Sequence, residues 1–397
     1  MILAAAADGV VADALLDLFV VLLAAKLGDE LFKRLGQPTI VGEILAGVVV
    51  GSSVLGVVEP TETLAVFAEL GVVFLLFWVG LETRLTDMAE VGTTAALVGA
   101  LGFALPLAGG VGLGSALGES GATSIFLGAA LVATSVGITS AALIDIGVLG
   151  TRPARTILGA AVVDDILAMI LLAVAAGITA GGGFAATEIA VVVALALGFV
   201  AFFGLGGTRL LRTQPRLLHR PRFSESPLLP AVLLALGLAA FAAEIGLAAI
   251  IGAFLAGMMV AETKEQHPIE DEIAPLYAFF PPFFFAFIGL QLDLSAFADA
   301  GTLALLGGVT LLAVATKFAG AWLGARPFGA RDAAFVGVGM VPRGEVGIIV
   351  AGIGRAADVI DDELFAVIVG MSILTTLLVP PLLRVLAPRR DPAPTQS

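Results

Sequence analysis

Residues 157–170 read Ile-Leu-Gly-Ala-Ala-Val-Val-Asp-Asp-Ile-Leu-Ala-Met-Ile, so two adjacent acids interrupt an apolar run. Asp164 and Asp165 lie about twelve residues into an apolar segment that we expect over residues 153–179. A helix of that length crosses the hydrocarbon core of a bilayer, about 30 Å thick, with both carboxylates near the midplane. Charged groups there are costly unless they pair or border a cavity. The stretch therefore predicts a membrane helix that carries a functional site.

The composition of the whole chain is that of a membrane protein. Of its 397 residues, 59% are hydrophobic and 13% are charged, and the mean hydropathy is +1.08. Soluble globular proteins have roughly 45–50% apolar and about 25% charged residues. A soluble domain of this length could not bury the excess apolar surface, which excludes a cytosolic enzyme.

The residue types that are rare in this chain exclude several kinds of site. Cysteine is absent, and the two histidines, His219 and His267, are 48 residues apart in polar connecting segments. Disulfides, Cys-based zinc sites and multi-His metal centres are therefore excluded, and we expect neither a cofactor nor enzymatic activity. The net charge of −13 argues against a nucleic-acid partner, and we interpret it as the charge of a halophile's protein. The first eight residues carry no basic side chain, so we expect no cleaved signal peptide.

Thirteen segments are apolar and long enough to span a bilayer. They cover residues 9–32, 38–57, 62–82, 88–117, 122–147, 153–179, 184–212, 227–244, 246–262, 268–290, 296–325, 330–356 and 361–387. Seventeen of the 20 Lys and Arg residues follow odd-numbered segments. Because basic residues mark the cytoplasmic side, we expect a multi-pass protein of a prokaryotic cell membrane, with its N-terminus outside and its C-terminus in the cytoplasm.

Two parts of the chain resemble later parts at nearly the same offset. Residues 40–50 match residues 250–260 at an offset of 210, and residues 80–85 match residues 289–294 at an offset of 209. This offset equals seven segments, an odd number, so the second copy is inverted relative to the first, which is typical of alternating-access transporters. The predicted divisions are a first repeat over 1–183, a linker helix and basic loop over 184–226, an inverted second repeat over 227–388 and a cytoplasmic tail over 389–397.

Two segments that correspond in the two copies are interrupted near their middle. Residues 133–140 read Ala-Thr-Ser-Val-Gly-Ile-Thr-Ser, and residues 340–347 read Met-Val-Pro-Arg-Gly-Glu-Val-Gly. Gly and Pro weaken a helix, and a broken helix leaves partial charges at the bilayer midplane. Arg343 and Glu345 would compensate these charges, or they would form a static ion pair inside the bundle.

Lys317 is a further charge inside an apolar segment. It lies about two-thirds of the way along residues 296–325, with no loop within easy reach. It therefore needs an acid partner, and Asp164 or Asp165 is the natural candidate. Such a group of two acids and an amine is suited to exchanging protons near neutral pH.

Together these motifs resemble the monovalent cation:proton antiporters of the sodium/proton exchanger superfamily, especially its NapA-like and Kef-type branch. The resemblance covers nearly the whole chain and is carried by residues 133–139, 159–165 and 342–347 and by Lys317. It implies an all-α polytopic membrane fold with 13 transmembrane helices, built from two inverted six-helix repeats with crossed broken helices. It also implies a six-helix core, a dimerisation domain and a homodimer that works by an elevator-like movement of the core.

The resemblance also implies roles for particular residues. Asp165 is the carboxylate that binds Na⁺, next to Asp164, which pairs with Lys317 when no ion is bound. The Asp-Asp pair with Lys317 resembles the electrogenic class, which exchanges two protons per cation. One departure from the family is Ala142, where relatives often carry Arg. The supporting residues at the crossing of the broken helices are Thr134, Ser135, Arg343 and Glu345.

We therefore expect an antiporter in which Na⁺, or else Li⁺ or K⁺, competes with protons for the midplane aspartates. A sodium-coupled solute symporter with crossed broken helices is the alternative, but it should lack a buried lysine. A cation channel is a weaker alternative, because it gains nothing from inverted broken helices with an internal ion pair. The expected partners are the cation, H⁺, the lipid bilayer and a second copy of the chain.

Overall fold

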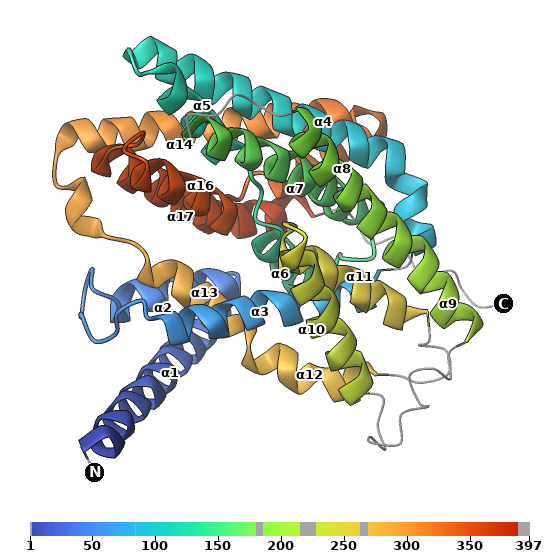
Figure 1. The fold of residues 1–397 in the computed structure, drawn as a ribbon, viewed down its shortest axis with the longest axis horizontal. Helices are drawn as coiled ribbons and strands as arrows, with labels where there is room; N and C mark the ends of the chain where they lie inside the picture. Colours follow the sequence, from blue (N-terminus) through green and yellow to red (C-terminus); the bar gives the residue numbers. More distant parts are fainter. Residues whose placement is uncertain (1, 84, 180–185, 215–227, 263–268, 388–397) are drawn as a thin grey trace.

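The computed structural model describes residues 2–83, 85–179, 186–214, 228–262 and 269–387, and within these ranges every regular element is a helix (Figure 1). Seven helical segments of the described chain are long and apolar enough to cross a membrane, and four shorter helices are also apolar. The protein is therefore an all-helical, multi-pass membrane protein. The number of spans and the side on which each terminus lies stay predictions.

The helices follow one another with short connections. The first half contains α1 (Ile2–Arg34), α2 (Thr39–Val50), α3 (Glu62–Leu81), α4 (Leu85–Leu117), α5 (Gly121–Val132), α6 (Val136–Asp145) and α7 (Arg152–Thr179). The middle contains α8 (Ala186–Phe199), the π-helix η1 (Val200–Gly207) and α9 (Thr208–Thr213). The second half contains α10 (Leu228–Glu244), α11 (Ala249–Ala261), α12 (Glu270–Phe279), α13 (Pro281–Leu290), η3 (Leu294–Phe297), α14 (Ala300–Ala325), η4 (Arg326–Phe328), α15 (Ala330–Gly339), α16 (Glu345–Ala356) and α17 (Asp362–Leu386).

Polar residues at the helix ends explain several of these boundaries. The Thr61 side chain accepts a hydrogen bond from the backbone N–H of Leu64, and this fixes the start of α3. The side chains of Ser120, Asp299 and Asp361 cap α5, α14 and α17 in the same way. Each cap satisfies a backbone donor that has no partner inside its own helix, so these helices begin where the apolar runs begin.

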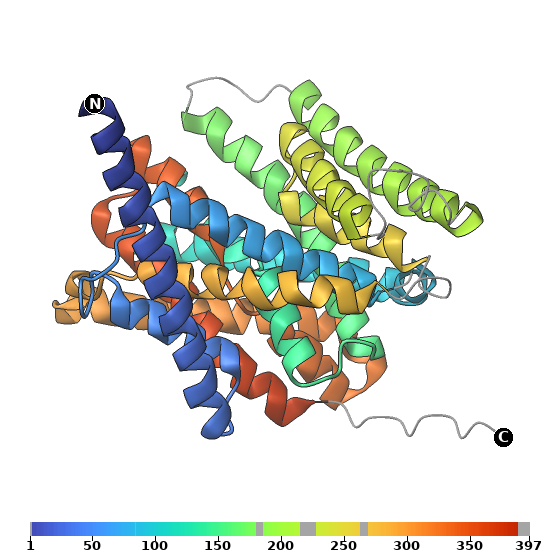
Figure 2. The same ribbon diagram turned by 90° about the horizontal axis from the view of Figure 1, so that it is seen from below.

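The helices pack into two groups, which lie one above the other in Figure 1. The scaffold group consists of α1, α2, α3, α10, α11, α12 and α13, and the core group consists of α4, α5, α7, α14, α15, α16 and α17. Helix α6 contacts α2 and α3 on one side and α7 and α17 on the other, so it joins the two groups. Helices α8 and α9 run along one flank of the molecule beside α10 and α11 (Figure 2).

Glycines allow the closest helix contacts in the scaffold group. A Cβ atom on Gly47 of α2 would lie 2.0 Å from a backbone oxygen of α13, and one on Gly289 of α13 would lie 2.1 Å from a backbone oxygen of α2. Helices α3 and α11 meet in the same way, because a Cβ on Gly80 or on Gly257 would lie 2.2 Å from a backbone oxygen of the facing helix. Such contacts are typical of membrane helices that pack through small residues. Gly47 and Gly257 are 210 residues apart, and Gly80 and Gly289 are 209 apart, which are the two offsets of the sequence match.

Candidate functional site

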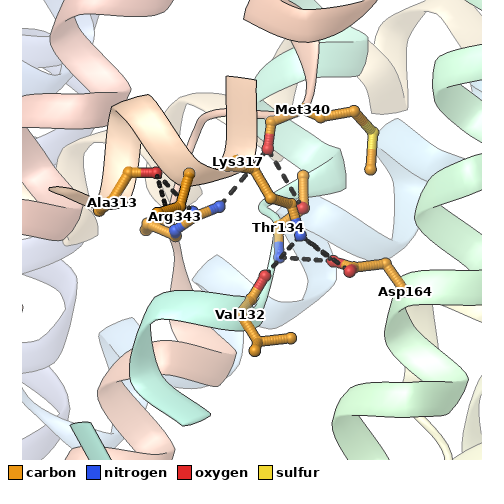
Figure 3. Close-up of polar contacts among 8 residues, drawn as sticks. Val132, Thr134, Asp164, Ala313, Lys317, Met340 and Arg343 are labelled. Carbon is orange, nitrogen blue, oxygen red and sulfur yellow. Dashed lines mark hydrogen bonds and ion pairs between the residues drawn. The ribbon is translucent and has the colours of Figure 1, made fainter. Parts of the chain in front are cut away.

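Both predicted helix interruptions are present, and they contact each other. The chain leaves the helix at residues 133–135, between α5 and α6, and at residues 340–344, between α15 and α16. The backbone N–H of Ser135 donates a hydrogen bond to the carbonyl of Pro342 at 2.8 Å. The Thr134 hydroxyl donates to a carbonyl of the second interruption at 3.2 Å (Figure 3). We call these two contacting interruptions the crossover.

Beside the crossover, Lys317 of α14 and Asp164 of α7 form an ion pair in which both side chains are 0% exposed. The Lys317 Nζ atom lies 2.8 Å from one Asp164 carboxylate oxygen and 2.9 Å from the other. Nζ also donates to the carbonyl of Val132, the last residue of α5, at 2.6 Å (Figure 3). The backbone N–H of Thr134, just before α6, donates to the Asp164 carboxylate at 3.1 Å.

This arrangement matches the partial charges of the broken helix. The C-terminal end of a helix carries partial negative charge and the N-terminal end carries partial positive charge. The Lys317 ammonium lies at the end of α5, and the Asp164 carboxylate lies at the beginning of α6. Of the two acids that the residues left open as partners for Lys317, the structure pairs it with Asp164.

Asp165 is the next residue on α7 and faces a different environment. It is 3% exposed and borders a narrow hollow of about 10 Å³, which is no more room than one water molecule needs. Neighbouring residues on a helix point about 100° apart, so the two carboxylates face different elements. The hollow lies between α3 and α11 of the scaffold group and α6 and α7. Its other lining residues are all apolar: Leu76, Val136, Leu158, Val162, Ile250, Ile251 and Phe254.

Arg343 is a second buried cation at the crossover, and its side chain is also 0% exposed. Its guanidinium group donates to the carbonyl of Met340 at 3.5 Å and to that of Ala313 in α14 at 3.2 Å (Figure 3). Met340 follows the last residue of α15, so the cation lies at the negative end of this half-helix. Glu345 begins α16, but its side chain lies outside the described part of the chain. Its predicted ion pair with Arg343 therefore stays a prediction.

Sequence reasoning missed several groups that hold the site together. Adjacent hydroxyls on α17 fix the backbone of Arg343, because its N–H donates to Thr375 at 3.1 Å and its carbonyl accepts from Thr376 at 3.0 Å. The sequence signal for these hydroxyls was the presence of two adjacent threonines inside an apolar segment. The carbonyls of Val132 and Ala313 gave no such signal, because every residue has one. His219 and His267 lie outside the described residues.

Comparisons with known proteins identify the family. The family described as "sodium/hydrogen exchanger, transmembrane" matches residues 19–386. The chain belongs to the sodium/hydrogen exchanger family. It is 37% identical over 376 residues to the Na⁺/H⁺-K⁺ antiporter GerN of Bacillus cereus, covering 94% of this chain and 96% of GerN. It is 35% identical over 417 residues to the high-affinity Na⁺/H⁺ antiporter NhaS3 of Synechocystis, covering 94% of this chain and 90% of NhaS3.

A solved structure shares the fold of this sodium/hydrogen exchanger. The sodium proton antiporter MjNhaP1 from Methanocaldococcus jannaschii aligns with a TM-score of 0.66 and 18% identity, over 94% of this chain and 99% of the other. The resemblance to cation:proton antiporters that the motifs predicted is thus confirmed at the level of the family. Exchangers are transporters rather than enzymes.

Proposed function

We propose that this protein exchanges Na⁺ for H⁺ across a membrane by alternating access. One observation carries the proposal: the buried Lys317–Asp164 pair bridges the two half-helix ends of the first interruption, directly beside Asp165. An exchange of Na⁺ for H⁺ is also supported by the names of the relatives, which are Na⁺/H⁺ antiporters. The name of GerN includes K⁺, so K⁺ is the second cation to test.

Competition between Na⁺ and protons at one site couples the two fluxes. Asp165 binds the cation. When the ion pair between Lys317 and Asp164 breaks, Asp164 becomes the second carboxylate that binds the cation. A low-dielectric site stabilises only enough positive charge to balance its two carboxylates, so a bound Na⁺ displaces protons. The loaded core then moves, and protonation from the other side of the membrane releases Na⁺.

We propose that two protons exchange for one Na⁺, which makes the cycle electrogenic. One net charge then crosses the membrane per cycle, which is worth about 2.3 kcal/mol per 100 mV. A membrane potential that is negative inside would thereby drive the extrusion of Na⁺. The two acids and Lys317 together provide the titratable groups that this stoichiometry requires.

We also propose the finer architecture that the sequence predicts: thirteen spans in two inverted repeats, assembled as a homodimer in a prokaryotic cell membrane. The glycine contacts support the repeat, because residues that match at offsets of 210 and 209 make equivalent contacts between α2 and α13 and between α3 and α11. The distribution of basic residues supports an N-terminus outside and a C-terminus in the cytoplasm.

The test is transport in proteoliposomes that enclose a pH-sensitive dye, with Na⁺, Li⁺ and K⁺ added in turn and with a membrane potential imposed. We expect Na⁺-dependent dissipation of the pH gradient, at a rate that responds to the potential. Asp165→Asn should abolish it. Asp358→Asn is the matched control, because Asp358 is an exposed acid with φ of 55°, a conformation that Asn adopts easily. Exchange retained by Asp165→Asn would refute the site, and Na⁺-driven uptake of organic anions without proton movement would indicate a symporter instead.

A further inference from the structure

Three exposed arginines lie at one end of the core group, where α7, α14 and α15 meet. Arg152 is the first residue of α7, Arg326 begins η4 directly after α14, and Arg331 lies in the first turn of α15. The guanidinium group of Arg152 lies over the ring of Phe328 in η4, with its Cζ atom 4.8 Å from the ring centroid. The Cζ atom of Arg326 lies 5.2 Å from the ring centroid of Trp322 in α14. We call Arg152, Arg326 and Arg331 the arginine surface.

The arginine surface has no acid partner. None of its three side chains forms an ion pair with any residue that the structure describes. Arg331 donates to the carbonyl of Ala387 at 3.3 Å, which leaves its charge uncompensated. At the other end of the core group, Arg355 also lies over a ring, that of Phe365 at 4.9 Å, but it pairs with Asp362 at 2.7 Å. The arginine surface therefore differs in having positive charge available for an external anion.

Two of these arginines lie at helix ends where a cation is unfavourable. The N-terminal end of a helix carries partial positive charge and favours an anion. Arg152 begins α7 and Arg331 is the second residue of α15, so each adds positive charge to an end that is already positive. Gly329, which precedes α15, has no side chain to cap this helix, and Asp332 in the same turn forms no ion pair with the arginine surface. An anion bound here would interact favourably with both the guanidinium groups and the helix ends.

The outer face of α14 indicates that this anion is a lipid headgroup. Five exposed residues without polar side chains lie on one face of this helix, at spacings of one, three or four residues: Ala304, Gly307, Gly308, Leu311 and Ala315. Leu311 is 70% exposed. The same face continues to Trp322 and, one turn later, to Arg326. In a multi-pass membrane protein such a face contacts acyl chains, and a tryptophan at its end marks the level of the headgroups. A lipid whose chains lie along α14 therefore has its phosphate at the level of Arg326.

We propose that the arginine surface binds the headgroup of an anionic phospholipid. Aromatic rings hold the guanidinium planes of Arg152 and Arg326, so their N–H groups are already oriented to donate paired hydrogen bonds to phosphate oxygens. Basic residues that only set the orientation of a membrane protein need neither a ring beneath them nor the absence of an acid partner. The inference concerns a partner of the core group and does not depend on which ion the protein transports.

The fluorescence of Trp322 tests the proposal, because the chain has two tryptophans and Trp78→Phe leaves only this one. The protein is reconstituted in phosphatidylcholine vesicles that contain a small fraction of lipid with brominated acyl chains, either phosphatidylglycerol or phosphatidylcholine. Bromine quenches tryptophan fluorescence on contact, so the quenching reports which lipid lies beside α14. The matched control is Arg209→Gln, because Arg209 is also exposed but lies on α9, which packs against η1 and α11.

We expect brominated phosphatidylglycerol to quench Trp322 as strongly as an at least tenfold larger fraction of brominated phosphatidylcholine. One basic residue near an anionic headgroup corresponds to about a fivefold change in binding. Arg152→Gln and Arg326→Gln should therefore each lower the preference for phosphatidylglycerol about fivefold, whereas Arg209→Gln should leave it unchanged. The two lipids are compared within each variant, because Arg326→Gln also alters the surroundings of Trp322. Inorganic phosphate, added at constant ionic strength, should not displace the lipid.

Equal quenching by the two lipids, or an unchanged preference in both Arg152→Gln and Arg326→Gln, would overturn the proposal. An equal loss of preference in Arg209→Gln would also overturn it, because the lipid would then be attracted by the charge of the whole protein rather than by this site. Displacement by inorganic phosphate would show that the arginine surface takes a free phosphate, which contradicts the assignment to a lipid.

Discussion

The Lys317–Asp164 pair makes a quantitative prediction about stability. Lys317→Met removes the ammonium but keeps the length of the side chain, and it leaves Asp164 buried with one hydrogen bond, from the Thr134 backbone. It also leaves the carbonyl of Val132 without its donor. Removing one member of a buried pair costs about 3–5 kcal/mol, because the remaining charge has lost its compensation. We expect a melting temperature several degrees lower than that of the unmodified protein.

A double-mutant cycle measures how much of this loss belongs to the pair. We expect Lys317→Met combined with Asp164→Asn to be more stable than the sum of the single losses predicts, by about 2 kcal/mol or more, because no buried charge is left alone. The matched control is the pair Arg355–Asp362, whose Nε–O distance is also short, at 2.7 Å, but whose side chains are 50% and 83% exposed. Its coupling should stay below about 1 kcal/mol.

The assay is thermal unfolding of the purified protein in detergent. Additive losses in the double variant would refute the view that Lys317 and Asp164 stabilise the protein as a charged pair.

Three further predictions follow from other contacts. Glu69 is an exposed acid two turns inside α3, so its charge should raise the local concentration of cations. Glu69→Gln should therefore raise the Na⁺ concentration for half-maximal exchange about two- to fivefold with little change in maximal rate, and the difference should shrink at high ionic strength. A lower maximal rate alone would contradict a role in attracting cations. Thr134→Val removes the hydroxyl that joins the two interruptions, so it should lower the free energy of unfolding by about 1–2 kcal/mol and slow exchange. Normal stability and a normal exchange rate would show that the backbone contacts alone hold the two interruptions together. Gly80→Val should crowd α11 and lower the melting temperature, at a cost of about 1–3 kcal/mol in the free energy of unfolding. Gly112→Ala on α4 should not, because a Cβ atom there has nothing within 4 Å. Equal effects of the two changes would argue against close packing as the cause.

The helices and their interruptions could be predicted because the relevant signals are local. A run of about twenty apolar residues between polar residues predicts a helix without knowledge of its neighbours, and Gly or Pro inside the run predicts a break. The π-helix η1 could not be predicted in this way, and residues 184–212 read as one apolar segment. Its last residue, Gly207, lies against Met259 of α11, where a Cβ would be 2.6 Å from the Met259 side chain. This contact joins segments far apart in the sequence.

The candidate site, like the fold, could be predicted only where the signal is local in the sequence. The sequence pointed to Asp164, Asp165 and Lys317, because charges in apolar segments stand out. Which acid pairs with Lys317 depends on the rotation of α7 about its axis, and residues on either side of the Asp pair are equally apolar. The structure decides this and adds the backbone partners: Val132 receives a hydrogen bond from Lys317, and Arg343 donates to carbonyls rather than to a described acid.

A single nitrogen atom, Nζ of Lys317, joins three stretches of chain that are far apart in sequence. Nζ contacts three oxygen atoms: both carboxylate oxygens of Asp164 and the carbonyl of Val132 at the end of α5. An ammonium group has three hydrogens, one for each of these contacts. When one hydrogen leaves, at least one of these contacts loses its donor. Loss of a proton from this one atom thereby loosens the contacts that join α5, α7 and α14.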